Sequence, residues 1–128
     1  MRVLVVDDHA VVRQALARML GQEPDIEIVG EASNGKIAVE LTRQLLPDVV
    51  TMDISMPVMD GIKATRTIRA ECPQVRVIGL SMYEEEEQAL AMREAGAVAY
   101  LTKSGPLDAL LAAIRACLEP NTRSPGVC

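Results

Sequence analysis

Five polar residues occupy positions at which their side chains could act together in chemistry. Asp7 and Asp8 directly follow an apolar run near the start of the chain, and Asp53 follows a second such run. Ser81 and Lys103 stand at the ends of two further apolar runs. If these runs are parallel strands of one sheet, three carboxylates, a hydroxyl and an ammonium converge on one edge of that sheet.

The charges of such a cluster indicate what it would bind. Two carboxylates about 4 Å apart repel each other by roughly 4 kcal/mol at an effective dielectric constant of ~20, so three acids need nearby cations. Lys103 compensates one charge, and a divalent ion would compensate the rest. The nearby ligands are oxygen atoms apart from His9, which we expect to be a solvated residue in the first turn of a helix. Oxygen ligands favour Mg²⁺.

A magnesium site of this kind suits the transfer of a phosphoryl group. Mg²⁺ commonly binds one or two carboxylates together with waters and phosphate oxygens. A carboxylate such as Asp53 can act as a nucleophile and carry an aspartyl phosphate. The metal and Lys103 would then spread the charge of the phosphoryl group, and Ser81 would donate a hydrogen bond to it.

The elements that must position these residues alternate regularly along the chain. Short apolar runs predict strands at 3–6, 26–29, 48–52, 75–80 and 98–101. Apolar residues at helical spacing predict helices at 9–20, 34–45, 61–71, 84–95 and 107–118. Five strand-then-helix units in series imply an α/β fold, in which one parallel five-stranded sheet carries helices on both faces as a single doubly wound domain.

The composition argues against several other classes of protein. The chain has 128 residues and a net charge of −5, and its 13 basic residues are scattered, which argues against direct binding of nucleic acid by this segment. The apolar runs are of strand length, so we expect neither a membrane span nor a signal peptide. Cys72, Cys117 and Cys128 have no metal-ligand spacing, and we expect reduced thiols in a cytoplasmic protein.

Four segments together carry a resemblance to a known family. The segments VLVVDDH, DVVTMDISMPVMDG, VIGLSMY and GAVAYLTKS resemble the receiver domain of two-component response regulators, from Met1 to about Leu118. The stretches DDHAVVRQALARML and LSMYEEEE are most similar to the NarL/FixJ (LuxR-type) subgroup, whose receivers precede a helix-turn-helix DNA-binding domain. The resemblance implies a CheY-like, flavodoxin-like (βα)5 fold with strand order 2-1-3-4-5.

The resemblance also implies a role for each residue of the cluster. Asp53 would be the phosphoacceptor, which receives the phosphoryl group from a sensor histidine kinase. Asp8 would bind Mg²⁺ directly, Asp7 would help through a water molecule, and the backbone carbonyl of Ser55 would complete the protein ligands beside Asp53. Lys103 would contact the phosphoryl group. The domain would assist its own phosphorylation and dephosphorylation without being an enzyme.

A second set of implied roles concerns the response to phosphorylation. Ser81 takes the place of the family's switch Ser/Thr, and Tyr100 that of its switch aromatic residue. Phosphorylation would change the face formed by the fourth helix, fifth strand and fifth helix, and a homodimer could form through this face or through the fifth helix.

The output of the protein depends on what accompanies the receiver. We expect the receiver to span 1–118 and a linker or tail to span 119–128. DNA would be bound only through an output domain, and no helix-turn-helix pattern follows residue 118. The chain is therefore expected to be either a fragment of a transcription regulator or a stand-alone receiver that acts through protein contacts.

Several alternatives stay open at this stage. Asp7 and Asp8 could cap the first helix, and Ser81 could cap the fourth. Many receivers have a proline with a cis peptide bond after the lysine, whereas this chain has Ser104, which leaves the geometry of that loop open. The whole chain could also be a phosphohydrolase with an aspartate nucleophile, although Ser55 replaces the usual second acid, or a binding module that is not phosphorylated.

Overall fold

Five parallel strands form one sheet at the centre of the structure, a computed structural model that describes residues 1–82 and 86–117. The strands are β1 (Arg2–Val6), β2 (Glu27–Ala32), β3 (Val49–Asp53), β4 (Arg76–Ser81) and β5 (Ala99–Thr102). Their order across the sheet is β2-β1-β3-β4-β5, and every neighbouring pair is parallel. The predicted fold class and the strand order implied by the resemblance are therefore confirmed.

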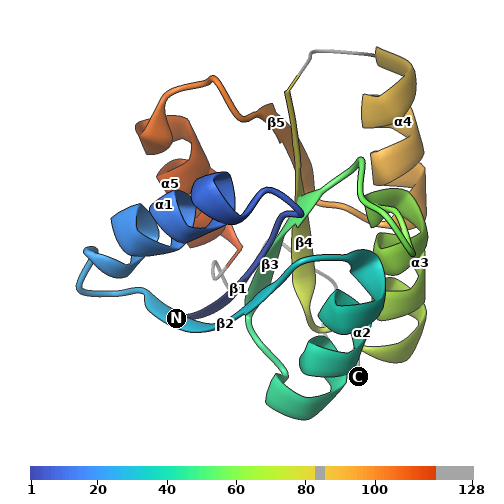
Figure 1. Cartoon of the computed structure of the whole chain (residues 1–128), viewed down its shortest axis with the longest axis horizontal. Coiled ribbons are helices and arrows are strands. Elements are labelled where there is room, and N and C mark those ends of the chain that lie inside the picture. Colours follow the sequence, from blue (N-terminus) through green and yellow to red (C-terminus); the bar gives the residue numbers. More distant parts are fainter. Residues whose placement is uncertain (83–85, 118–128) are drawn as a thin grey trace.

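Five helices cover the two faces of this sheet (Figure 1). They are α1 (Ala10–Gly21), α2 (Gly35–Leu45), α3 (Gly61–Glu71), α4 (Glu86–Ala95) and α5 (Leu107–Ala116). Helices α1 and α5 lie on one face, and α2, α3 and α4 lie on the other (Figure 1). The direction of winding reverses between β1 and β3, so a crevice is expected beyond the carboxyl ends of these two strands.

Aliphatic side chains from alternate strand positions fill the core on each face of the sheet. Val3 and Val5 belong to the core beneath α1 and α5, whereas Leu4 and Val6 belong to the core beneath α2, α3 and α4. β3 is buried at all five of its positions, and its last residue is Asp53. Because both faces of β3 are packed, a shift of register would move its side chains into the opposite core and disrupt the packing on both faces, so the position of Asp53 is well fixed.

The structure shows which side chains cap the helices that begin near the carboxyl edge of the sheet, and Asp7 and Asp8 are not among them. Asn34 accepts a hydrogen bond from the backbone N–H of Ile37 at 2.9 Å, and Asp60 accepts one from Lys63 at 2.8 Å. The N-cap of α1 is His9, whose side chain makes no capping hydrogen bond. The alternative in which Asp7 and Asp8 serve as the cap of the first helix is therefore wrong.

Two expectations from the sequence differ from the structure. The second strand runs over Glu27–Ala32 rather than 26–29, because its backbone continues to pair with β1 as far as Val6. The apolar stripe expected on the first helix is only partly buried, since Leu20 is fully buried whereas Val11 is 81% exposed. The expected start of the fourth helix at residue 84 and the expected tail at 119–128 lie outside the described residues.

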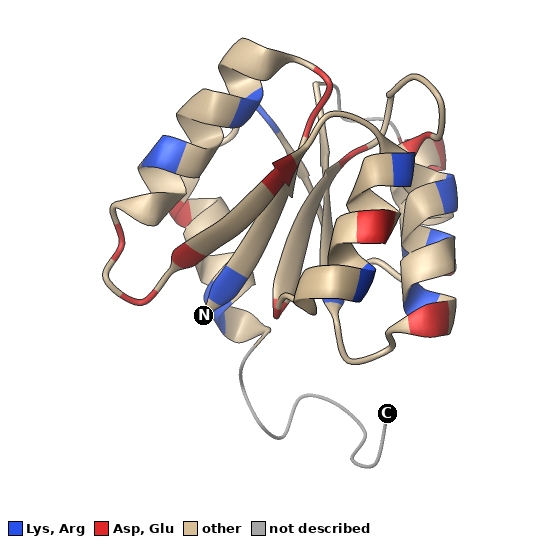
Figure 2. Ribbon diagram, turned by 60° about the horizontal axis from the view of Figure 1, so that its bottom comes forward, with Lys and Arg blue, Asp and Glu red and all other residues tan. Residues whose placement is uncertain are grey.

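Charged residues of both signs are dispersed over several helices and loops, as Figure 2 shows for one view of the domain. This distribution agrees with the scattered basic residues of the sequence. Within the described ranges, no helix combines the length and the apolarity that a membrane crossing requires.

Candidate functional site

Four charged side chains meet at the carboxyl edge of the sheet. Asp7 and Asp8 stand in the loop after β1, Asp53 ends β3, and Lys103 follows β5. The ammonium of Lys103 lies 2.7 Å from Oδ2 of Asp7 and 3.1 Å from Oδ1 of Asp53. The structure therefore brings together the acids and the lysine whose convergence the sequence predicts.

The backbone holds these side chains in place through hydrogen bonds between neighbouring elements. The N–H of Asp7 donates to the carbonyl of Ala32 at the end of β2, at 3.0 Å. The N–H of Lys103 donates to the carbonyl of Ser81 at the end of β4, at 2.7 Å. Each charged loop is thus tied to a strand other than its own, which fixes the loop relative to the sheet.

The return of the chain from Asp53 to α3 depends on a close backbone approach at Gly61. The N–H of Gly61 donates to the carbonyl of Ile54 at 2.8 Å, and a Cβ atom on Gly61 would overlap the carbonyl oxygen of Asp53. In the same loop, Met59 donates to the carbonyl of Pro57, and Val58 has a φ of 69°. A valine in this left-handed region is strained, so tertiary contacts hold the turn beside Asp53 in shape.

The surplus of acids changes the pKa values at this site. Burial, followed by the charge of Asp7, raises the pKa of Asp53 to about 6, and the opposing effect of Lys103 is smaller than these two together. Burial also disfavours the charged form of Lys103, but hydrogen bonding and charge from Asp7 and Asp53 outweigh it and raise the pKa of that lysine. The site therefore holds more negative charge than its own lysine can compensate.

The donor set fits a hard divalent cation. Carboxylate oxygens of Asp7, Asp8 and Asp53 and a ring nitrogen of His9 lie within 4.8 Å of one another. Oδ1 of Asp8 is buried and accepts no hydrogen bond from any described residue, although Nδ1 of His9 is 3.2 Å away. Such an unpartnered carboxylate oxygen beside two other carboxylates is suited to metal binding. The structure thus shows an acidic cluster that could hold a metal ion.

The structure tests the predicted position of His9 but not the predicted metal-ligand role of Ser55. The side chain of His9 is 66% exposed, which agrees with the expected solvated position at the start of the first helix. Ser55 is exposed in the loop after β3, and the role of its carbonyl as a metal ligand stays a prediction.

Ser81 and Tyr100 lie on the neighbouring strands at the same edge. Ser81 is the last residue of β4, is 7% exposed and pairs in register with Thr102. The alternative in which Ser81 caps the fourth helix involves residues outside the described ranges and stays open. Tyr100 is half-buried in β5, and its ring packs close to Gly79. No cis peptide bond occurs in the described part of the chain, so the bond between Lys103 and Ser104 is trans.

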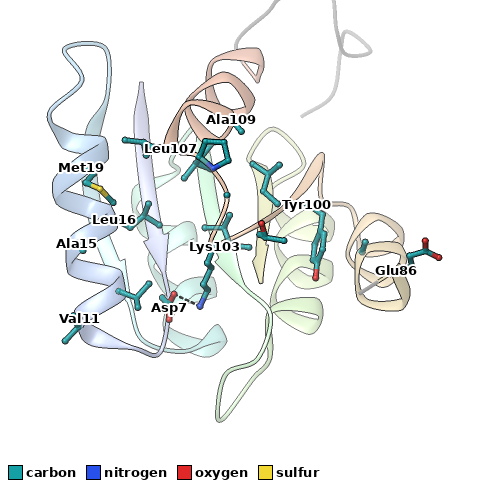
Figure 3. Close-up of a pocket in the computed structure, with 18 residues that line it drawn as sticks. Asp7, Val11, Ala15, Leu16, Met19, Glu86, Tyr100, Lys103, Leu107 and Ala109 are labelled. Atoms are coloured by element: carbon teal, nitrogen blue, oxygen red, sulfur yellow. Dashed lines mark ion pairs between the residues drawn. The ribbon is translucent and has the colours of Figure 1, made fainter. Parts of the chain in front are cut away.

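A groove of about 690 Å³ opens beside the cluster, between α1 and the start of α5. Figure 3 shows Asp7 and Lys103 at one end of it, with Val11 and Met19 along the α1 side. Both residues belong to the apolar helical spacing that predicts the helix at 9–20, yet Val11 is 81% and Met19 42% exposed. Periodicity identifies an apolar helix face but does not reveal whether a neighbouring element covers that face completely.

Comparison with known proteins extends this picture. Residues 3–115 match the family described as the response regulator receiver domain. The chain is 43% identical over 125 residues to the transcriptional regulatory protein LiaR of Bacillus subtilis, covering 96% of this chain and 59% of LiaR. It is also 41% identical over 129 residues to a protein-glutamate methylesterase/protein-glutamine glutaminase of Halalkalibacterium halodurans, covering 98% of this chain and 37% of that protein.

A solved structure agrees with the sequence matches. A two-component response regulator of the LuxR family from Aurantimonas superposes with a TM-score of 0.85 at 38% identity, covering 90% of this chain and 82% of that one. The chain spans about three fifths or less of the two curated relatives described above. The LuxR-family structure and the LiaR match support the NarL/FixJ subgroup. The chain belongs to the family of response regulator receiver domains, the phosphoacceptor domains of two-component signalling.

Proposed function

We propose that Asp53 is the phosphoacceptor of this receiver and that Asp7 and Asp8 hold a Mg²⁺ ion beside it. The observation that carries the proposal is the buried surplus of acids at the strand ends, with Lys103 in contact with both Asp7 and Asp53. Bound Mg²⁺ would supply positive charge that neutralises phosphoryl oxygens. The backbone carbonyl of Ser55 is proposed as a further ligand.

The chain's own residues have distinct tasks in the transfer. An Oδ atom of Asp53 attacks the phosphorus of a phosphohistidine on a sensor histidine kinase, so that an O–P bond forms while the N–P bond breaks. The electron pair of that bond stays on the imidazole, which takes up a proton from solvent. Lys103 already donates to Oδ1 of Asp53, and its ammonium can turn to a phosphoryl oxygen, while the hydroxyl of Ser81 donates to another.

The response to phosphorylation is proposed to run through Ser81 and Tyr100. Ser81 ends the strand beside β3, and the half-buried Tyr100 lines the groove on the next strand. A new hydrogen bond at Ser81 would bias two arrangements of the face formed by α4, β5 and α5. Two copies of the chain could then associate through this face or through α5.

For the whole protein we propose a cytoplasmic transcription regulator with a receiver at 1–118 and a linker or tail at 119–128. A helix-turn-helix domain outside this sequence would bind DNA. The similarity to a transcriptional regulatory protein and to a LuxR-family regulator supports this output. The receiver would have no enzymatic activity other than promoting its own phosphorylation and dephosphorylation. A catalytic output domain is the alternative, because a methylesterase is also among the relatives.

Mass spectrometry tests the proposed site. The chain is incubated with Mg²⁺ and a small phosphodonor such as acetyl phosphate, and we expect one added phosphoryl group. Omission of Mg²⁺ and the variant Asp53→Asn should each abolish the adduct. An adduct that persists in Asp53→Asn would overturn the assignment of the phosphoacceptor, and steady release of phosphate from many phosphate esters would favour a phosphohydrolase.

A further inference from the structure

Arg13 connects the acidic loop to two neighbouring elements. Its side chain is 16% exposed, although it carries a full positive charge on the second turn of α1. Nη1 donates to the backbone carbonyl of Asp7 at 2.9 Å, and Nε donates to Oε1 of Glu31 in β2 at 3.0 Å. The planar guanidinium can satisfy a carbonyl and a carboxylate at once, which an ammonium cannot do with the same geometry.

The hydrogen bond from Arg13 to the carbonyl of Asp7 also affects the orientation of Asp8. That carbonyl and the N–H of Asp8 belong to one rigid peptide plane. Anchoring the carbonyl therefore sets the orientation of the plane, and with it the direction in which the Cα atom of Asp8 presents its carboxylate. Arg13 reaches this plane without contacting either carboxylate group.

The two acids differ in how firmly their own side chains are held. The carboxylate of Asp7 accepts from the N–H of His9 at 2.9 Å and lies 2.7 Å from the ammonium of Lys103. Oδ1 of Asp8, in contrast, accepts no hydrogen bond from any residue that the structure describes, and the ionisable group beside it is the exposed ring of His9, with Nδ1 at 3.2 Å. The side-chain contacts of Asp8 are therefore fewer than those of Asp7, and the backbone that carries Asp8, whose preceding carbonyl Arg13 contacts, contributes more to the direction of its carboxylate.

We propose that Arg13 is a positioning residue for the metal site: it fixes the Asp7–Asp8 peptide plane so that the Asp8 carboxylate faces Asp53 before Mg²⁺ arrives. Glu31 holds the guanidinium in the required orientation from the edge strand. The inference rests on the proposed function, because it concerns the same Mg²⁺ site. Preorganisation of this kind increases affinity by reducing the ordering that binding must achieve.

Calorimetric titration with Mg²⁺ alone, without a phosphodonor, tests this role. We expect Arg13→Met to weaken Mg²⁺ binding about tenfold, the lower end of the effect of losing a partner that orients a metal ligand. Arg13→Lys should restore part of the affinity, because its ammonium can still donate to the Asp7 carbonyl. Circular dichroism confirms that each variant is folded, and the amide resonance of Asp8 in Mg²⁺-free protein should shift in Arg13→Met.

The matched control is Arg43→Met, which removes another arginine paired with an acid. Arg43 joins Glu71 between α2 and α3 through two hydrogen bonds, away from the acidic loop. Both variants make the net charge more negative by one, which should strengthen attraction of a cation at long range. Weaker binding in Arg13→Met but not in Arg43→Met therefore cannot arise from net charge.

The outcomes separate the inference from the proposed function. Folded Arg13→Met that binds Mg²⁺ as tightly as the parent overturns the positioning role and leaves the proposed function standing. A parent chain that binds no Mg²⁺ overturns both. If Arg13→Met does not fold, Arg13→Lys decides: weakened binding supports the role, and parental affinity overturns it.

Discussion

The charged side chains at the amino end of the sheet pair with backbone groups, whereas those at its carboxyl end lie mainly beside one another. At the amino end, the carboxylate of Asp48 accepts from the backbone N–H of Arg2 at 2.8 Å, and the Arg2 guanidinium donates to the carbonyls of Leu45 and Leu46. At the carboxyl end, three acids face one lysine, and Asp53 is 5% exposed.

This difference separates structural charge from functional charge. The amino-end groups bond to neutral backbone, and Arg2 satisfies carbonyls that the end of α2 leaves without intrahelical partners. At the carboxyl end, burial and then the charge of Asp7 raise the pKa of Asp53, and keeping this group ionised costs stability. Uncompensated buried charge of this kind marks a candidate functional site, because packing alone gives no reason to keep it.

The largest expected effect is that of a methyl group beside Asp53. Gly61→Ala should lower the free energy of unfolding by about 3 kcal/mol, because the new Cβ would overlap the carbonyl oxygen of Asp53 and the backbone must shift. Urea denaturation measures the change.

The matched control for this substitution is Gly21→Ala at the end of α1. The nearest atom to its Cβ would be Cγ1 of Ile28 at 3.6 Å, an ordinary contact. We expect this variant to be at least as stable as the parent, because alanine favours helix over glycine. Equal stability of the two alanine variants would show that the carboxyl edge does not need its close backbone approach.

A pH titration of stability measures the cost of the buried acids. The pKa of Asp53 is raised from 3.8 to about 6, so between these values the folded state keeps a proton that the unfolded state releases. The proton held by Asp53 therefore contributes to the free energy of unfolding. In Mg²⁺-free buffer this contribution is fully present below pH 4 and falls by roughly 2 kcal/mol as the pH rises through 6. Asp53→Asn lacks this component.

The difference between Asp53→Asn and the parent is therefore the quantity to measure. It should be small at pH 4 and grow in favour of the variant toward pH 7. Added Mg²⁺ should reduce it, since the ion binds the folded parent and stabilises it. A difference that does not change with pH would contradict the charge surplus inferred for the carboxyl edge.

The smallest expected effect lies at the amino end. Arg2→Met should lower the free energy of unfolding by about 1 kcal/mol, the usual net value of such hydrogen bonds. It should leave Mg²⁺ affinity unchanged, because the amino and carboxyl ends are separated by the length of the strands. Thermal unfolding and calorimetry check these points, with Arg66→Met on the exposed side of α3 as the control. Altered Mg²⁺ binding in Arg2→Met would remove the distinction between the two edges.

Much of the fold was predictable because its signals are local. Apolar runs of strand length and apolar residues at helical spacing are each recognisable within a few residues. The second strand was placed too short because Gly30 and Glu31 belong to an edge strand, where hydrogen bonding to β1 rather than an apolar run defines the element. The sequence does not predict that α1 is partly exposed, because Val11 has the same spacing as the core residues of that helix.

The sequence predicts the charged residues of the candidate site but not the residue that holds its backbone in place. Asp7, Asp53 and Lys103 stand at strand ends, and parallel strands bring such ends together. Arg13 gives no signal of this kind, because a charged residue on a helix is ordinarily solvated. Its role depends on a backbone carbonyl and on Glu31, and neither contact follows from residue type.

The sequence by itself determined the order of strands and helices, the acidic and basic residues at the strand ends and the likeness to receiver domains. Those features depend on periodicity and on the nearest neighbours in the chain. Only the tertiary structure decided that Lys103 touches two acids, that the pKa of Asp53 rises, and that Arg13 holds the Asp7–Asp8 peptide plane. These depend on distances between segments far apart in sequence, which are fixed when the strands assemble into one sheet.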